Sequence, residues 1–211
     1  TIGDGAQTGK DGVESSQSIA IGFDAKAQGD QSIALGANVR ATGDSSVAIG
    51  GDDVDRLANN LDMNKKYEDL TGIKLVDKNY PRTTASGGGA TAVGTQATAS
   101  GDFSTALGMT SVASGTASSA LGVYAKASGG AALAIGAISK AEAEQSIALG
   151  TNAKVNSNAT NSIAIGNGAI ALNRDSIAIG SGSKADSTTL SNEAYLVGGM
   201  TSGEMNIGNR R

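Results

Sequence analysis

Lysines that recur at a regular spacing are the first candidates for binding chemistry in this sequence. Lys126, Lys140 and Lys154 follow one another at a spacing of fourteen positions. Other members of the same row are Lys26, Arg40 and Lys184. Cations stacked in this way can contact an anionic partner, but such charges also keep an exposed sheet surface soluble and protect it from association. Both interpretations stay open, and solubility is the simpler one.

A second group of candidate binding residues lies in the middle of the chain. Lys65, Lys66, Tyr67 and Tyr80 fall within the segment 51–89, which breaks the spacing that governs the rest of the sequence. Tyrosines and cations on a protruding loop are typical of recognition surfaces, because rigid scaffolds often carry their binding residues on loops. The alternative is that this segment only packs against a neighbouring chain. The sequence leaves both interpretations open.

The composition gives little support for catalytic chemistry. The 211 residues contain no histidine and no cysteine, which removes thiol nucleophiles, disulfides, Ser-His-Asp triads and the usual zinc sites. Asp30, Asp44 and Asp102 lack the repeat of calcium-binding β-rolls, so turn capping explains them more simply. We therefore expect no catalytic residue, no cofactor, no metal site and no enzyme activity. A net charge of -4 also argues against a nucleic-acid partner.

Glycine-terminated pentapeptides supply the elements that would position these residues. Clear copies are SIAIG at 18–22, SIALG at 32–36, SVAIG at 46–50, STALG at 104–108, SIALG at 146–150, SIAIG at 162–166 and SIAIG at 176–180. The closing glycines stand at positions 22, 36, 50, 94, 108, 122, 136, 150, 166 and 180, so most steps are fourteen positions long, with one of sixteen and one of forty-four. Such a period is the signature of a solenoid, in which each repeat stacks on the next.

A second short alternating segment lies between the pentapeptides. Examples are AKAQG at 25–29, VRATG at 39–43 and ATASG at 97–101. Each fourteen-residue unit therefore holds two strands and two turns, with glycine and aspartate at the corners. Such a unit is too short for a three-sided coil with ordinary strands. The predicted fold class is all-β, a β-roll (β-solenoid) with two-sided, fourteen-residue coils.

The alternation of side chains within the pentapeptide predicts an oligomer. Ser18 and Ala20 point to one side of a strand, while Ile19 and Ile21 point to the other. Only the small residues fit the thin interior of a two-sided roll, since the reverse arrangement would need a thicker coil. The aliphatic residues would then form an outward stripe larger than a monomer normally exposes. Burying one such side chain is worth about 1.5–3 kcal/mol, which favours a closed ring of identical chains.

The predicted interface consists of the aliphatic residues of the pentapeptides, although their pattern does not choose between two and three subunits. These residues are Ile19, Ile21, Ile33, Leu35, Val47, Ile49, Leu107, Ile147, Leu149, Ile163, Ile165, Ile177 and Ile179.

The repeated SIAIG-type pentapeptides resemble the heads of trimeric autotransporter adhesins of the YadA type. The resemblance covers about residues 15–50 and 90–185, and GNRR at 208–211 is similar to the start of the family's neck. It implies a left-handed parallel β-roll, a homotrimer, and display at the bacterial cell surface from the outer membrane, with the membrane anchor outside this sequence. It also implies attachment to host cells or to extracellular matrix proteins of the fibronectin, laminin or collagen class. The pentapeptides are scaffold and do not identify the ligand.

The domain organisation follows from where the regular spacing holds. We predict roll coils over 1–50 and 90–186, an insertion over 51–89 and a transition towards the neck over 187–211. Within the insertion, Asp52 or Asp53 would cap a short helix that carries Val54, Leu57 and other apolar residues at helical spacing. The rest of the insertion would leave the roll.

Two other functions remain for a repetitive β-solenoid. An ice-binding solenoid would need a regular outward row of threonines, and only Thr91 and Thr105 fall at such positions in the pentapeptides. A purely structural spacer would need no binding residues at all. A polysaccharide-processing enzyme is disfavoured, because the chain offers no convergent cluster of carboxylates.

Overall fold

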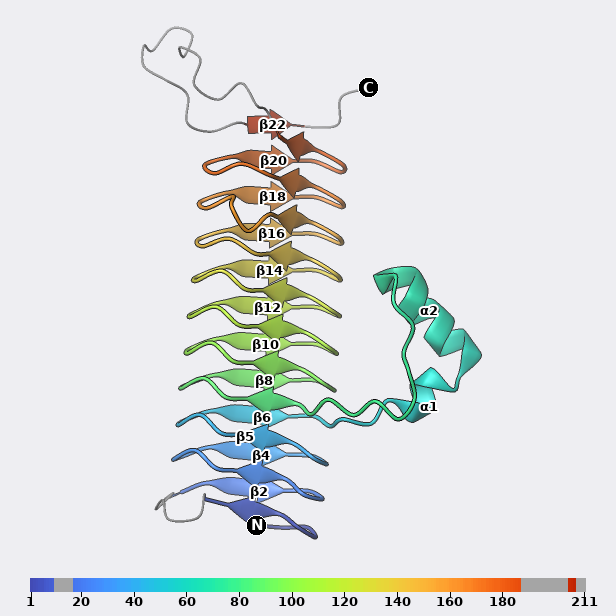
Figure 1. The fold of residues 1–211 in the computed structure, drawn as a ribbon, viewed down its shortest axis with the longest axis vertical. Helices are drawn as coiled ribbons and strands as arrows, with labels where there is room; N and C mark the ends of the chain where they lie inside the picture. Colours follow the sequence, from blue (N-terminus) through green and yellow to red (C-terminus); the bar gives the residue numbers. More distant parts are fainter. Residues whose placement is uncertain (10–16, 187–204, 208–211) are drawn as a thin grey trace, which may run out of the picture.

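The protein is a two-sided parallel β-roll from which one helical segment projects (Figure 1). The structure is a computed structural model that describes residues 1–9, 17–186 and 205–207. The two sides of the roll are two 11-stranded sheets, and all neighbouring strands within them are parallel. In the described part of the chain, no helix has the length and apolar character that crossing a bilayer requires. The predicted fold class is confirmed.

One sheet, the long-strand sheet, is built from the three-residue strands of the pentapeptides. Its order is β2 (Ile19–Ile21), β4 (Ile33–Leu35), β6 (Val47–Ile49), β8 (Thr91–Val93), β10 (Thr105–Leu107), β12 (Ser119–Leu121), β14 (Leu133–Ile135), β16 (Ile147–Leu149), β18 (Ile163–Ile165), β20 (Ile177–Ile179) and β22 (Met205–Ile207). The strand β22 falls within the predicted transition 187–211, which otherwise lies outside the described residues.

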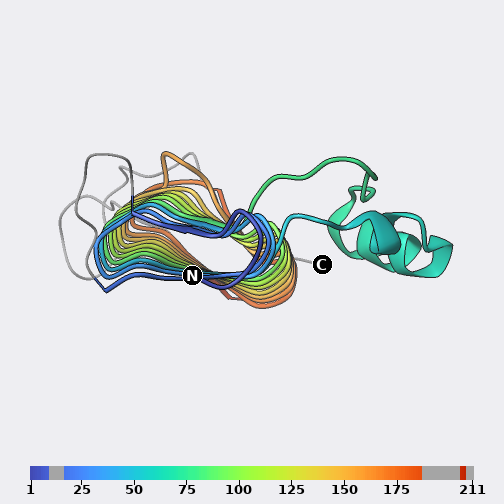
Figure 2. The ribbon, with the colours of Figure 1, turned by 90° about the horizontal axis from the view of Figure 1, so that it is seen from below.

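The other sheet, the short-strand sheet, is built from two-residue strands. Its order is β1 (Gln7–Thr8), β3 (Lys26–Ala27), β5 (Arg40–Ala41), β7 (Thr84–Ala85), β9 (Thr98–Ala99), β11 (Val112–Ala113), β13 (Lys126–Ala127), β15 (Lys140–Ala141), β17 (Lys154–Val155), β19 (Ile170–Ala171) and β21 (Lys184–Ala185). Seen along the axis of the roll, the two sheets form two flattened layers. The insertion projects sideways from one edge of these layers (Figure 2).

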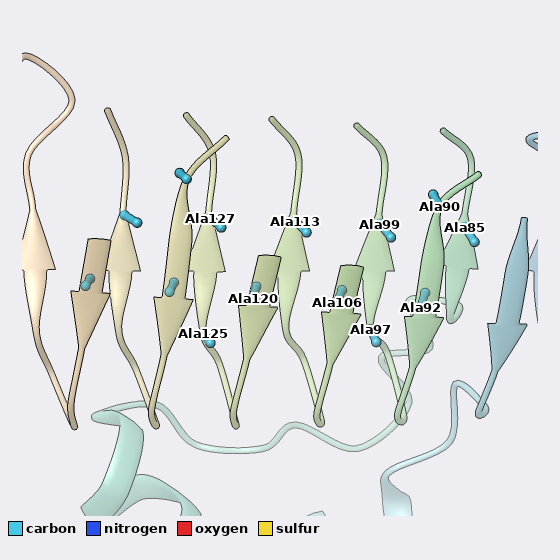
Figure 3. Packing of buried hydrophobic residues seen from close by; sticks show 14 of the residues in the cluster. Ala85, Ala90, Ala92, Ala97, Ala99, Ala106, Ala113, Ala120, Ala125 and Ala127 are labelled. Carbon is cyan, nitrogen blue, oxygen red and sulfur yellow. The ribbon is translucent and has the colours of Figure 1, made fainter. Parts of the chain in front are cut away.

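The core between the sheets consists almost entirely of alanine and serine. Alanines from both sheets, among them Ala106 and Ala113, point into this space and are fully buried (Figure 3). Most of the buried serines donate their hydroxyl groups to nearby carbonyls, as where Ser32 Oγ donates to Gly29 O at 2.7 Å, whereas the hydroxyl of Ser46 has no partner among the described residues. The predicted arrangement, with small residues inside, is therefore what the roll adopts.

Stacked glycines form most of the corners at which the strands end. Gly108 adopts φ +128°, and a Cβ at this residue would lie 2.7 Å from the carbonyl oxygen of Gly122 in the next coil. At the end of the short strands, a Cβ on Gly101 would lie 2.1 Å from Gly115 O. Because no side chain fits at these distances, the coils stack directly at these corners with glycine, whereas Ala143 holds the equivalent corner ahead of the sixteen-residue step.

The insertion contains two helices rather than the single one predicted. They are α1 (Asp55–Ala58) and α2 (Leu61–Thr71), and the longer helix begins after Asn60, whose Oδ1 accepts from Met63 N at 3.1 Å. Of the two predicted caps, Asp53 accepts from Asp55 N at 2.8 Å, whereas Asp52 belongs to the roll. The predicted helical spacing was correct, but Asn60 caps a second helix and so divides the helical segment in two.

The insertion is also shorter than the predicted range 51–89. Gly51 accepts a backbone hydrogen bond from Gln96 N at 3.0 Å, and Thr83 is fully buried at the position that Val39 and Ala97 hold in their coils. Only residues 53–82 therefore leave the roll. The glycines at 87–89 resemble a linker in sequence, yet they form an ordinary corner ahead of β8.

Candidate functional site

The outward residues of the long-strand sheet form one aliphatic stripe along the roll. All of the predicted interface residues face outward, and each is exposed or half-buried on the single chain. Ile19 and Leu107 are the most exposed of them, at 47% and 45%. The structure thus places these side chains together on one surface. It contains a single chain, so their burial against other subunits stays a prediction.

Polar residues interrupt the aliphatic stripe in one of its two columns. Thr91, Thr105 and Ser119 occupy the first outward position of three neighbouring strands, where the flanking strands carry Val47 and Leu133. The second column remains aliphatic on every strand from β2 to β20. Its residues are Ile21, Leu35, Ile49, Val93, Leu107, Leu121, Ile135, Leu149, Ile165 and Ile179. The stripe is therefore continuous despite the polar window.

The short-strand sheet turns a different surface outward. Lys126 pairs in register with Lys140, which pairs with Lys154, so the three lysines stand on adjacent strands and form what we call the lysine ladder. Lys26 and Arg40 are also in register with each other, and Lys184 is separated from the ladder by Ile170. The predicted stacking of basic residues is what the structure contains, on the face opposite the aliphatic stripe.

The corner aspartates cap turns of the neighbouring coil. Asp44 Oδ1 accepts from Asp30 N at 3.0 Å, and Asp102 Oδ1 accepts from Gly88 N at 2.9 Å. Among the described residues, no group of three or more acidic, histidine or cysteine side chains is placed to hold a metal ion. The carboxylates therefore act on backbone N–H groups of the adjacent repeat.

Tyr67 holds the insertion against the edge of the roll. It is half-buried on α2, and its hydroxyl lies 3.0 Å from Thr110 Oγ1 in the turn before β11. Burial raises the pKa of the Tyr67 phenol. The side chain of Gln96, a turn residue that the sequence did not single out, donates from Nε2 to Asp52 O at 2.8 Å and to Asn79 O at 3.2 Å. It thereby joins both ends of the insertion to the roll.

Tyr80 forms a hydrogen bond within the insertion. Its hydroxyl donates to Asp55 Oδ2 at 2.7 Å, and this hydrogen bond raises the pKa of Tyr80 to about 12. The same interaction, together with a hydrogen bond from Lys78 N at 2.7 Å, lowers the pKa of Asp55. Tyr80 thus ties the returning segment to the start of α1.

Lys65 and Lys66 lie on the exposed side of α2. Each forms an ion pair one helical turn away, Lys65 with Asp69 and Lys66 with Asp62, and Asp69 raises the pKa of Lys65. The predicted ligand-binding residues therefore fall into three places. Lys65 and Lys66 are exposed on α2, Tyr67 bonds to the roll and Tyr80 bonds within the insertion, and three lysines stand on the short-strand sheet.

An apolar hollow of about 240 Å³ lies between α2 and the roll. Leu57, Met63 and Leu70 line it from the insertion, and Met109 and Val123 line it from the corners that follow β10 and β12. These corner residues come directly after Gly108 and Gly122, which close two strands of the aliphatic stripe. The insertion therefore extends the apolar surface around the edge of the roll.

The repeats of the roll match a known family. The pattern of the YadA head domain repeat matches residues 15–38, 40–52, 85–111, 113–137, 127–153 and 157–183. These ranges include more than half of the chain, so it belongs to this family and is an adhesin head of the YadA type. The matched ranges omit residues 53–84, which agrees with the projection of the insertion from the roll.

The chain is also similar to a solved structure. The crystal structure of the collagen-binding domain of the Yersinia adhesin YadA is 26% identical in sequence, with a TM-score of 0.48. The similarity covers 86% of this chain and 76% of that one. A search of curated proteins returned no match.

Proposed function

We propose that this chain is the binding head of a trimeric adhesin at the bacterial cell surface, and that it attaches the cell to host cells or extracellular matrix. The head acts by binding and carries out no catalysis. Three copies pack against one another through their aliphatic stripes. Their short-strand sheets and insertions then face the surroundings. Fibronectin, laminin and collagen are the matrix proteins that such a head is expected to contact.

The observation that carries this proposal is the contrast between the two outer surfaces. The long-strand sheet exposes aliphatic side chains over its whole length, from Ile19 to Ile179, whereas the short-strand sheet turns mainly basic residues and threonines outward, with Val112 and Ile170 as aliphatic exceptions. A stripe of this kind is larger than the apolar patches that monomers normally leave in water. Full burial of such a side chain is worth about 1.5–3 kcal/mol, and each stripe residue contributes the part that is still exposed, so the many residues together favour association through this face.

Binding of the intact protein to surfaces coated with collagen, fibronectin or laminin tests the proposed attachment. We expect saturable binding to at least one of these proteins and none to an albumin-coated surface. Absence of binding to all three matrix proteins and to host cells would contradict the proposed function.

A deletion variant separates the roll from the insertion as the binding element. Gly50 and Gly94 are forty-four positions apart, so deleting the thirty positions 53–82 joins Asp52 to Thr83 and restores the usual step of fourteen. Thr83 already occupies its buried place in the coil, so the roll should still form. Binding that survives the deletion would assign attachment to the roll. Binding that is lost from a variant with an unchanged number of subunits would assign it to the insertion.

A further inference from the structure

The three lysines of the ladder differ from the lysines at the two ends of the same row in their ion pairing. At those ends, Lys26 lies 3.1 Å from Asp24 and Lys184 lies 2.5 Å from Asp186. Among the ion pairs of the described residues, none involves Lys126, Lys140 or Lys154. Within that part of the chain, the three ladder lysines therefore have no carboxylate at ion-pair distance.

The regular register of the sheet fixes the spacing of these cations. Neighbouring strands of a sheet lie about 4.8 Å apart, so the ladder from β13 to β17 extends over roughly 10 Å. Mutual repulsion of the three ammonium groups is relieved when anions lie between them. A linear polymer with repeated anionic groups satisfies this geometry better than a single small ion.

A hollow of about 390 Å³ adjoins the ladder. Thr110, Val112, Tyr124, Lys126 and Lys140 are among the residues that line it. It gives the ladder a concave border in which the half-buried Tyr124 supplies an aromatic side chain next to the cations. An aromatic ring beside cations suits a ligand that has both an apolar face and anionic groups.

A second hollow continues the first towards the insertion. It shares Thr110 and Tyr124 with the first hollow, and Lys74 of the insertion lines it as well. The side chain of Lys74 is exposed, and its ion-pair partner Glu68 is 3.9 Å away, at the outer limit for such a pair. One surface therefore runs from Lys154 along the ladder, past Tyr124, to a fourth cation on the insertion.

We propose that this surface binds a sulfated polysaccharide. The sulfate groups contact the ladder lysines, a sugar ring lies against Tyr124, and the chain extends towards Lys74. Lysine is a compact point charge that suits isolated sulfate groups, whereas planar bidentate recognition would favour arginine. A single tyrosine does not provide the series of stacking platforms that single-stranded nucleic acids use. This inference rests on the proposed function, because it names a ligand class for an adhesin head.

The overall charge of the protein does not attract a polyanion. The chain carries 16 basic and 20 acidic residues, so attraction has to come from a local group of cations. The ladder and Lys74 supply such a group on a surface that the proposed assembly leaves open.

Heparin binding by the full chain tests the proposal directly. In the variant K126T/K140T/K154T each lysine is replaced by the residue that β7 and β9 carry in the same register, Thr84 and Thr98, so the roll accommodates the change. We expect the variant to bind heparin at least about tenfold more weakly, which corresponds to about 1.4 kcal/mol. Wild-type binding should disappear in about 1 M salt, where the Debye length is about 3 Å.

Matched controls distinguish the ladder from a general effect of charge. Lys26→Thr removes a cation of the same row that is already paired with Asp24. Heparin affinity should therefore change less than twofold. Tyr124→Thr, which reproduces the residue found at Thr110 one coil earlier, should weaken binding severalfold without changing the charge. Equal losses in Lys26→Thr and in the single variant Lys140→Thr would overturn the assignment to the ladder.

Three other results would overturn the proposal. They are undiminished heparin binding by the triple variant, equal binding of desulfated heparin, and tighter binding of duplex DNA than of heparin. Attachment to collagen, fibronectin and laminin is measured with the same proteins. Loss of heparin binding alone would leave the proposed adhesin function in place, whereas failure of the wild-type protein on every matrix protein and on host cells would contradict that function instead.

Discussion

The two sheets of the roll share one interior and have opposite outer surfaces. Ala141 in β15 and Ala148 in β16 belong to the same coil, and both are fully buried in the same thin core. Their neighbours Lys140 and Ile147 point outward on opposite faces. The interior therefore determines the backbone of both sheets, and the outward residues alone determine what each face contacts. One face can be altered while the other and the fold stay intact.

The largest effect is expected when the aliphatic face of the long-strand sheet is given the positive charge of the short-strand sheet. Ile147, Ile163 and Ile177 stand on three neighbouring strands, so I147K/I163K/I177K creates a basic ladder on the long-strand sheet. Burying unpaired charges in an interface costs several kcal/mol for each ion, and the assembly should be lost. Sedimentation should then report the mass of one folded chain.

The matched control for this variant lies on the opposite face. K126T/K140T/K154T changes the same number of residues on the short-strand sheet and should keep the oligomeric mass of the wild-type protein. If the isoleucine variant keeps that mass as well, the aliphatic stripe is not the interface.

A substitution in the shared interior should affect both faces. Gly101→Ala places a Cβ 2.1 Å from Gly115 O, and such overpacking typically costs about 1–3 kcal/mol in the free energy of unfolding. Gly130→Ala is the control, because its Cβ would meet only Glu144 Cγ at 3.9 Å, and we expect a change within about 0.5 kcal/mol. Urea unfolding at one fixed protein concentration measures both variants. Similar stabilities would mean that the corner glycines do not limit stacking.

A smaller effect is expected at the contact between the insertion and the edge of the roll. Tyr67→Phe removes the hydrogen bond to Thr110 and should destabilise this contact by about 1 kcal/mol. Hydrogen exchange should become faster in α2 and stay unchanged in β10 and β12. Faster exchange throughout the roll would show that the insertion supports the sheets as well.

The smallest effect is a local pH dependence within the insertion. The pKa of Tyr80 is raised to about 12, so its contribution is complete below the ordinary value of 10 and is lost as the pH rises towards 12. The pKa of Asp55 is lowered, so its contribution is present above its ordinary value of 3.8 and is lost as the pH falls through the lowered value. The amide of Lys78, which donates to Asp55, reports both changes by NMR. Tyr80→Phe should abolish the alkaline change and move the acidic one towards the ordinary pKa of Asp55, because the Tyr80 hydroxyl is the largest cause that lowers this pKa.

The repeating part of the fold could be predicted because each residue's side is fixed by a period of two. Once Ile19 and Ala20 alternate in so short a coil, the small residue has to face the interior. The same spacing predicts that Lys126, Lys140 and Lys154 stand on adjacent strands, as they do. The same alternation of side chains recurs in coil after coil, so each repeat supports the same prediction.

The insertion could be predicted only in outline, because it occurs once and its contacts are not local. The cap at Asn60 is one of several polar residues that could have started a helix, and nothing near Tyr67 indicates that its partner is Thr110. Thr83 to Ala85 match the short-strand pattern, yet the whole insertion separates them from the rest of their coil. Gln96 and Tyr124 occupy turn positions whose residues vary from coil to coil, so their roles became visible only in the structure.

The mass of the protein in solution tests the central claim, that the aliphatic stripe is buried between chains. Sedimentation equilibrium over a range of protein concentrations measures it without any label or ligand. The account predicts a single species of three times the 20.7 kDa chain mass. A monodisperse species of 20.7 kDa that persists as the concentration rises would contradict it, because the outward isoleucines and leucines would then be stable in water.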